Sequence, residues 1–273
     1  MKIRQIRNAT LLIEYGGVKF LVDPMLSAKS AWPAFAGTAN DHLRNPTVDL
    51  VVPIEDILAV YAVIVTHTHT DHWDKAAAEN IPADTPIYVQ HFGDKALVSN
   101  GGYIELEGQP HLAMIEGKTF TNVKVLTGNP EVQGVKLRKV PGQHGSDVAI
   151  EHAYDALQEV CGVVFSHPDE KTLYLAGDTV WNEYVEANIA KYAPEVIILN
   201  AGDAQIPGLG AIIMDANDVL KVCEAAPEAT IVASHFEAVN HGVATRDELR
   251  QLIGLHSLED RVLVPEDGET VAR

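Results

Sequence analysis

A group of histidines directly after an apolar run is the feature that most constrains this chain. The run from Tyr61 to Val65 is apolar and rich in β-branched residues, which predicts a buried strand. The turn that follows holds His67, His69, Asp71 and His72. Side chains two positions apart in extended backbone point the same way, so His67 and His69 can share one ion while Asp71 and His72 reach a second point nearby. The spacing therefore predicts a site for two adjacent metal ions.

The residue types in this turn indicate a catalytic metal site. Imidazole binds zinc and other first-row ions, and structural zinc sites usually recruit cysteine thiolates instead. A structural metal is the alternative interpretation. The two cysteines, Cys161 and Cys223, lie in separate apolar stretches without metal-ligand spacing, so we expect free buried thiols in a reducing compartment.

The pattern His-x-His-x-Asp-His after an apolar strand resembles the signature of the metallo-β-lactamase superfamily. The resemblance implies an α/β fold, the four-layer αββα sandwich, with further metal ligands at the ends of later strands. Three residues that follow apolar runs match this expectation, namely His144, Asp178 and His235. We therefore expect all seven residues along one edge of the sheets.

A hairpin near the start of the chain agrees with this resemblance. The segments Thr10 to Tyr15 and Val18 to Val22 flank the pair Gly16-Gly17, which predicts two strands joined by a glycine turn. The second strand runs into Asp23-Pro24. Such a start is similar to the broad group that includes ascorbate-6-phosphate lactonases and other metal-dependent hydrolases.

We assign the seven candidate ligands to two divalent ions. One ion takes His67, His69 and His144, the other takes Asp71, His72 and His235, and Asp178 bridges them. Zinc is favoured for this set, with manganese or iron left open. Two cations sharing a water lower its pKa towards neutrality and so supply a hydroxide nucleophile. Asp71 is also the candidate catalytic residue, because its carboxylate can accept a hydrogen bond from that hydroxide.

Composition limits the class of protein and of partner. With 273 residues, 47% of them hydrophobic, the chain can build one large core, and we expect a single domain over residues 1–273. The net charge of −18 argues against nucleic acid as a partner. No apolar run is long enough to cross a membrane, and the chain enters a strand pattern at once without a signal peptide, so we expect a cytoplasmic protein. A small-molecule substrate is expected; an anionic one and a homo-oligomeric state are left open.

Periodicity and capping residues predict the helices and strands that follow the metal turn. Strand patterns gather in two blocks, one of them between Tyr103 and Val140, with helices after each block, and this fits two packed sheets with helices outside. A further buried strand is expected from Glu195 to Asn200. The predicted helices are Asp74 to Glu79, Phe92 to Ser99, Val180 to Tyr192, Asp215 to about Ala226, and Thr245 to about Leu255.

The stretch from Met25 to Pro53 has no convincing period and predicts a long loop. Because it follows Asp23-Pro24, its aromatic residues Trp32 and Phe35 are candidates for the wall of a substrate pocket; packing on the domain or on another subunit is the equal alternative. Trp181 and His241 are further candidates for substrate binding. A core position for Trp181 and a surface or capping role for His241 are their respective alternatives.

Three functional classes fit these residues. The first is a metal-dependent hydrolase that cleaves an ester, lactone, phosphodiester or amide bond in a small molecule. The second is a redox member of the same fold with a di-iron centre and a flavin partner, which the resemblance disfavours because those relatives carry an acidic residue where this chain has His69. The third is a non-catalytic metal-binding or scaffold protein of the same fold. The complete ligand set favours the first class.

Overall fold

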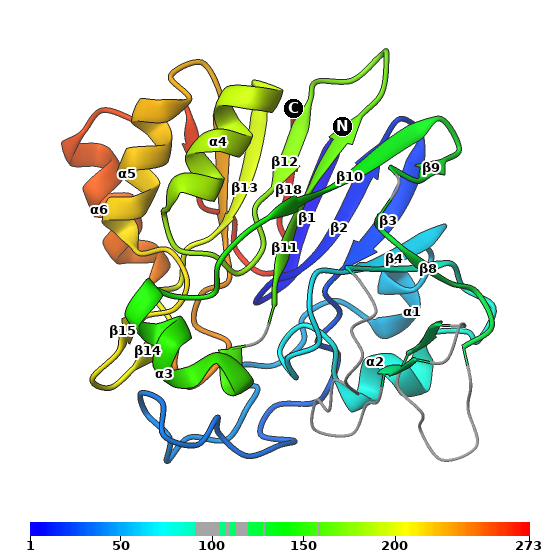
Figure 1. Cartoon of the computed structure of the whole chain (residues 1–273), viewed down its shortest axis with the longest axis horizontal. Coiled ribbons are helices and arrows are strands. Elements are labelled where there is room, and N and C mark those ends of the chain that lie inside the picture. The colour runs from blue at the N-terminus through cyan, green and yellow to red at the C-terminus, as the bar shows by residue number, and fades with distance from the viewer. Residues whose placement is uncertain (91–103, 107–109, 113–119, 128, 158) are drawn as a thin grey trace.

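The computed structural model describes residues 1–90, 104–106, 110–112, 120–127, 129–157 and 159–273. Two mixed sheets of seven strands lie face to face, and helices cover their outer sides, which gives the predicted αββα sandwich (Figure 1). The helix predicted from Phe92 to Ser99 lies outside the described residues, as does part of the strand block predicted from Tyr103.

The first sheet contains the predicted hairpin and the strand before the metal turn. The hairpin strands pair antiparallel with Tyr15 opposite Val18, and the next three strands of the sheet run parallel to the second of them. In sheet order its strands are β18 (Thr270–Ala272), β1 (Lys2–Arg7), β2 (Thr10–Tyr15), β3 (Val18–Val22), β4 (Ala62–Val65), β5 (Ile87–Val89) and β8 (Val123–Val125).

The second sheet is built from later segments. Its strand β13 is buried at all five positions, as expected for a central parallel strand, and it matches the segment predicted to end at Asn200. In sheet order the strands are β17 (Val262–Leu263), β16 (Thr230–Ser234), β13 (Val196–Asn200), β12 (Leu173–Leu175), β11 (Cys161–Ser166), β10 (Val135–Pro141) and β9 (Glu131–Val132). Two small hairpins lie outside these sheets, β6 (Ile104–Leu106) with β7 (Pro110–Leu112) and β14 (Gln205–Ile206) with β15 (Gly210–Ala211).

Strand direction places three of the candidate ligands at the same end of the second sheet. Strands β12, β13 and β16 are parallel, and β10 runs the same way because it is separated from β12 by the antiparallel β11. The segments after β10, β12 and β16 therefore leave the sheet at the same end. His144, Asp178 and His235 occupy those segments.

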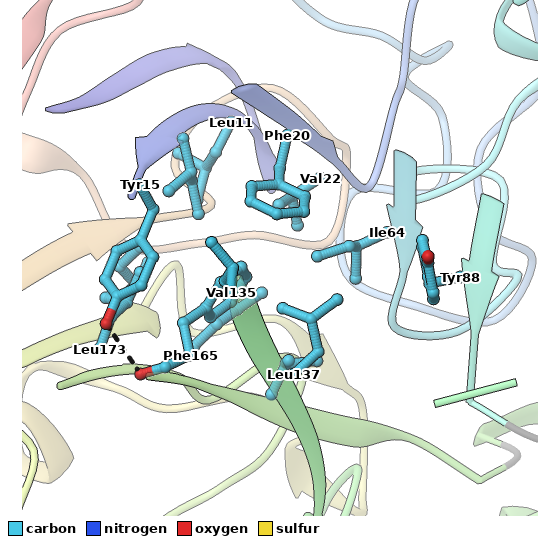
Figure 2. Close-up of a cluster of buried hydrophobic side chains, with 14 of the residues drawn as sticks. Leu11, Tyr15, Phe20, Val22, Ile64, Tyr88, Val135, Leu137, Phe165 and Leu173 are labelled. Carbon is cyan, nitrogen blue, oxygen red and sulfur yellow. Dashed lines mark hydrogen bonds between the residues drawn. The ribbon is translucent and has the colours of Figure 1, made fainter. Parts of the chain in front are cut away.

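The apolar core lies in three layers. Between the sheets, Phe20 packs edge to face with Phe165 at 5.6 Å between ring centroids, and the Tyr15 hydroxyl donates to the Phe165 carbonyl at 3.2 Å (Figure 2). A second cluster joins the other face of sheet two to helices α4 (Glu183–Tyr192), α5 (Ala216–Ala225) and α6 (Arg246–Leu255). A third cluster joins sheet one to α1 (Ile54–Ile57) and α2 (Lys75–Asn80). Alternation along the strands creates the inner layer: in β10, Val135 and Leu137 point inward while Lys136 is exposed.

The predicted helices are present wherever the structure describes them. Asp74, Asp215 and Thr245 each cap a helix, and Thr245 forms a capping box with Glu248. The helix predicted from Val180 begins later, because the Asn182 side chain caps it and Glu183 is its first residue. The helices are α1 (Ile54–Ile57), α2 (Lys75–Asn80), α3 (Asp147–Leu157), α4 (Glu183–Tyr192), α5 (Ala216–Ala225) and α6 (Arg246–Leu255).

Helices α1 and α3 are additions to the sequence-based prediction. Helix α3 is kinked at Ala153, whose φ of −133° and ψ of 24° are not helical. Its buried residues Ala149 and Leu157 pack against Ile212 and its neighbours, far along the chain. Among the described residues, no helix combines the length and apolar character needed to span a bilayer.

Candidate metal centre

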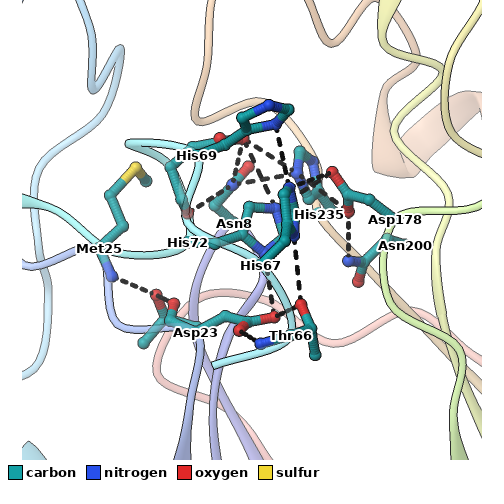
Figure 3. A network of polar contacts seen from close by, with 12 residues as sticks. Asn8, Asp23, Met25, Thr66, His67, His69, His72, Asp178, Asn200 and His235 are labelled. Carbon is teal, nitrogen blue, oxygen red and sulfur yellow. Dashed lines mark hydrogen bonds and ion pairs between the residues drawn. The ribbon is translucent and has the colours of Figure 1, made fainter. Parts of the chain in front are cut away.

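Seven side chains from both sheets meet at the edge described above. The turn after β4 supplies His67, His69, Asp71 and His72 from the first sheet, and the segments after β10, β12 and β16 supply the other three (Figure 3). All seven are buried except His69, which is partly exposed. Figure 3 shows the side chains of His67, His69 and His72 meeting those of Asp178 and His235.

The first group consists of three imidazoles. The Nε2 atom of His67 lies 3.0 Å from Nδ1 of His69, and Nε2 of His144 lies 3.3 Å from the same Nδ1. One nitrogen from each ring lies within 4.8 Å of the others, close enough for one ion to contact all three. This is the set that the sequence assigns to one ion.

The second group joins a carboxylate to two imidazoles. Asp71 Oδ2 lies 3.2 Å from His235 Nε2 and 3.8 Å from His72 Nε2. These three side chains also offer ligand atoms within 4.8 Å of one another. They are the set that the sequence assigns to the other ion.

Asp178 lies between the two groups. Its Oδ2 atom is 3.1 Å from His72 Nε2 and 3.6 Å from His144 Nε2, and its Oδ1 atom is 3.8 Å from His235 Nε2. The Asn200 amide donates to Oδ1 at 2.7 Å and fixes the carboxylate. Oδ2 thus lies between His72 of the second group and His144 of the first, so this one carboxylate contacts both groups, as a bridging ligand requires.

Most of the imidazoles are held from behind by an oxygen acceptor on the ring nitrogen that faces away from the centre. His72 Nδ1 donates to Asp23 Oδ2 at 2.9 Å, and Asp23 also accepts from the Thr66 backbone N–H and hydroxyl, both at 2.7 Å. His144 Nδ1 donates to the Ile212 carbonyl at 2.8 Å. Such outer contacts fix the ring orientation and leave the other nitrogen free to bind a cation.

The charge states of these groups fit a pair of divalent cations. Burial lowers the pKa of His67 and His144, and it lowers that of His69 to about 4, so these rings are neutral with free lone pairs. Burial alone would raise the pKa of Asp178, but His72 and His235 outweigh it and hold that pKa well below its usual range. Neutral imidazoles beside ionised carboxylates are the ligand state that a metal ion needs.

His72 carries the positive charge of the centre when no cation is bound. Burial would lower its pKa, yet Asp178, Asp71 and Asp23 outweigh burial and raise that pKa well above its usual value. A divalent ion binding there would displace the proton, so metal uptake should release protons. The donor set therefore fits two divalent cations.

The two aromatic candidates in the loop over residues 25–53, Trp32 and Phe35, lie in different surroundings. Phe35 lies at the centre, with its ring centroid 4.7 Å from that of His241 and 6.4 Å from that of His69. Trp32 is only 9% exposed and packs behind Phe35 at 5.4 Å, in a cluster with Met25 and the 238–239 segment. Phe35 thus lies against the histidines of the site, and Trp32 packs behind it in the core.

The other two candidates for substrate binding, His241 and Trp181, lie in different surroundings. His241 is buried, which rules out the surface role considered for it, and its Nδ1 atom has no hydrogen-bond partner within the described part of the chain. Burial lowers the pKa of His241 to about 4, and the charge of Asp71 partly opposes this shift. Trp181 packs against the cluster between sheet two and its helices, and its backbone N–H donates to Asp218 at 3.2 Å.

Several residues of the site were not singled out from the sequence. In the sequence, Asp23 marks only the end of the hairpin and Asn200 only the end of a strand. Asn240 is not among the predicted site residues, yet its side chain accepts from the Phe35 N–H and donates to Thr38 and to the Ala39 carbonyl, so it holds the long loop in place. A glycine is also required: a Cβ at Gly202 would lie 1.8 Å from the carbonyl oxygen of His235. Asp23 and Asn200 share one local signal, a polar residue at the end of a strand.

Comparison with known proteins agrees with this geometry. Residues 19–236 match the family model described as a beta-lactamase superfamily domain. The chain belongs to the β-lactamase superfamily. Within this superfamily it is 41% identical over 271 residues to the UPF0173 protein YddR of Bacillus subtilis, and the match covers 99% of both chains.

Two solved structures of superfamily members resemble the whole chain. An isothiocyanate hydrolase from Delia radicum gut bacteria is 48% identical, with a TM-score of 0.89, and the match covers 100% of this chain and 99% of that chain. A possible metal-dependent hydrolase from Veillonella parvula is 39% identical, with a TM-score of 0.90 and the same coverage. The predicted superfamily and sandwich fold are confirmed, and the protein is a metal-dependent hydrolase. The narrower similarity to ascorbate-6-phosphate lactonases stays a prediction.

Proposed function

We propose that this protein hydrolyses a small, neutral organic electrophile of the isothiocyanate class, using two divalent cations, zinc by preference, held by the seven residues. The observation that carries the proposal is the convergence of five imidazoles and two carboxylates at one sheet edge in a chain 48% identical to an isothiocyanate hydrolase. An isothiocyanate contains none of the four bond types expected from the sequence. Its central carbon is nevertheless open to attack by the same nucleophile, a hydroxide.

The charges around the centre favour a neutral substrate. In the described residues, every ion pair of the site carboxylates has an imidazole partner and none has Lys or Arg. The buried cation Arg7 is turned away, because its guanidinium donates to the Met25 and Ser27 carbonyls under the long loop. An anionic phosphoryl group would therefore meet no fixed cation from these residues, whereas the Phe35 ring offers contact to an apolar substituent.

The chain's own residues can then be given roles. When bound, the cations would lower the pKa of a shared water and polarise the atom under attack. Asp71 accepts a hydrogen bond from the attacking water and orients it. His241, neutral at cellular pH, donates a hydrogen bond to the substrate nitrogen or sulfur, and Phe35 excludes bulk water from that side.

The reaction balances with one water molecule. The water oxygen bonds to the central carbon of R–N=C=S, both water protons end on nitrogen, and the carbon–nitrogen bond breaks. The products are the amine R–NH2 and carbonyl sulfide. No oxidant or further reactant is needed.

A substrate panel tests this proposal. Protein restored separately with zinc and manganese should consume an arylalkyl isothiocyanate, followed by its ultraviolet absorbance and by amine release. Matched assays on a lactone, a phosphodiester and an amide cover the bond types expected from the sequence. Turnover of one of these with no amine release from any isothiocyanate would overturn the proposed substrate, and binding of metal without turnover of any compound would favour the scaffold alternative.

A further inference from the structure

His235 is held differently from the other four histidines of the centre. In those four, the ring nitrogen that faces away from the centre has an oxygen partner: Asp23 for His72, and backbone or hydroxyl oxygens for the others. The corresponding atom of His235, Nδ1, is buried without a hydrogen-bond partner among the described residues. The usual second contact that fixes a metal-binding imidazole is therefore absent at this position.

The backbone at His235 also needs outside support. Its φ is +69°, in the left-handed region that costs a residue with a Cβ about 1 kcal/mol. This conformation is kept because Gly202 packs directly against the His235 carbonyl. On the other side, the His235 N–H donates to the carbonyl of Asn8 at 3.1 Å.

Asn8 contacts the second group through its side chain as well. Its Nδ2 atom lies 3.3 Å from Asp71 Oδ2, 3.3 Å from the Asp71 carbonyl and 3.2 Å from His235 Nε2 (Figure 3). The two amide hydrogens can both go to the Asp71 oxygens, which leaves the His235 lone pair free for a cation. Asn8 is buried in the turn between β1 and β2, and its carbonyl also accepts from Ser234.

We propose that Asn8 is the positioning residue of the second group, Asp71, His72 and His235, and that this group binds its cation more weakly than the group of His67, His69 and His144. Asn8 ties the Asp71 carboxylate of one sheet to the His235 turn of the other. The weaker affinity follows from the His235 ring, whose Nδ1 atom lacks, among the described residues, the oxygen partner that fixes the other four rings. The inference rests on the proposed two-cation centre.

Zinc titration against a competing chelator tests the inference without an activity assay. Wild-type protein should bind two zinc ions in two steps, and the His235→Ala variant identifies the second group as the step that it removes. Asn8→Gly keeps the left-handed backbone of Asn8, which has φ +54°, and deletes only the side chain. It should weaken the second step by roughly 10- to 100-fold and leave the first within about twofold.

The matched control is Asn129→Gly, because Asn129 is exposed and has the same φ of +54°. Equal weakening of both steps, or unchanged binding in Asn8→Gly, overturns the role of Asn8. A second step as tight as the first in wild-type protein overturns the affinity order. Should Asn8→Gly fail to fold, the Asn8→Asp variant keeps the size of the side chain. In that variant the zinc affinity of the second step must rise or fall by at least about tenfold. Wild-type protein that takes up no zinc contradicts the proposed centre itself.

Discussion

At the scale of single residues, the histidines and aspartates of the site differ in which side-chain atom is hydrogen-bonded and which faces the centre. His72 and His144 give one nitrogen to an oxygen behind them and present the other to the centre. His241 is buried beside them, but its closest ring neighbour is Phe35. Asp178 differs from Asp71 because its carboxylate contacts both groups. These differences separate the effects expected of single substitutions.

Asp178→Ala should weaken both cation sites and abolish hydrolysis, because one carboxylate reaches both groups. His235→Ala should mainly empty the second site, since its Nε2 lies 3.2 Å from Asp71 Oδ2 of the same group. Metal analysis after dialysis against a weak chelator measures both occupancies. Full occupancy of both sites in Asp178→Ala would show that the bridge is misassigned.

Acid should destabilise the metal-free protein through His241. The folded-state pKa of this residue is about 4 and its ordinary value is 6.5, so between these values the unfolded chain binds a proton that the folded chain does not. Stability therefore falls as pH drops from about 6.5 to about 4, by roughly 3 kcal/mol for this one group.

Urea denaturation of the metal-free protein at several pH values measures this effect. The His241→Gln variant should show a shallower loss of stability over the same window, and His256→Gln provides a control that removes an exposed histidine. An unchanged pH dependence in His241→Gln would mean that the buried imidazole is not the group responsible.

At the scale of elements, the long loop over residues 25–53 is held against the site by hydrogen bonds. Asn240 bonds the loop at Phe35, Thr38, Ala39 and Asn45, so the segment that follows His235 holds it in place. Arg7 fixes the beginning of the loop from beneath. The position of Phe35 over the site is thus set by polar contacts elsewhere in the loop.

Phe35→Ala and Trp32→Ala should have different consequences. Phe35→Ala should raise KM by about tenfold with little change in metal content, because it removes a contact to the apolar part of the substrate. Trp32→Ala should instead lower the free energy of unfolding by about 3–5 kcal/mol, since Trp32 is buried. Kinetics, metal analysis and urea denaturation distinguish them. A wild-type KM in Phe35→Ala on every substrate would rule out contact between Phe35 and the substrate. A changed oligomeric state would indicate that the loop is an assembly surface.

At the scale of the whole molecule, the centre joins the two halves of the sandwich. One sheet contributes four of the candidate ligands through a single turn, and the other contributes three through separate strand ends. Cations bound there would cross-link the sheets at one edge. Their contribution to stability adds to that of the apolar layer between the sheets.

Removing metal should therefore destabilise the whole fold. Zinc at about a thousandfold its dissociation constant should raise the free energy of unfolding by roughly 4 kcal/mol relative to chelator-treated protein. Urea denaturation with and without zinc measures this difference, and Asp178→Ala should lose most of it. Coincident denaturation curves for wild-type protein would contradict a cation site in the folded state.

The sequence by itself determined the features that depend on neighbouring residues. The hairpin before Asp23, the strand before His67 and the caps at Asp215 and Thr245 follow from alternation, glycine turns and capping side chains, and each is present in the structure. The spacing of the metal turn and strand-end residues was enough to nominate the seven side chains that the fold brings together. Their assignment as ligands stays a prediction.

Tertiary structure alone decided which side chain supports which ligand. Asn8 and His235 are 227 positions apart, so no local pattern could pair them. Burial of Trp32 and formation of helix α3 likewise depend on contacts with distant segments. Local sequence sets backbone preference and the inward face of each element, whereas the partners of a buried polar atom are set by whichever segments the packed sheets bring to it.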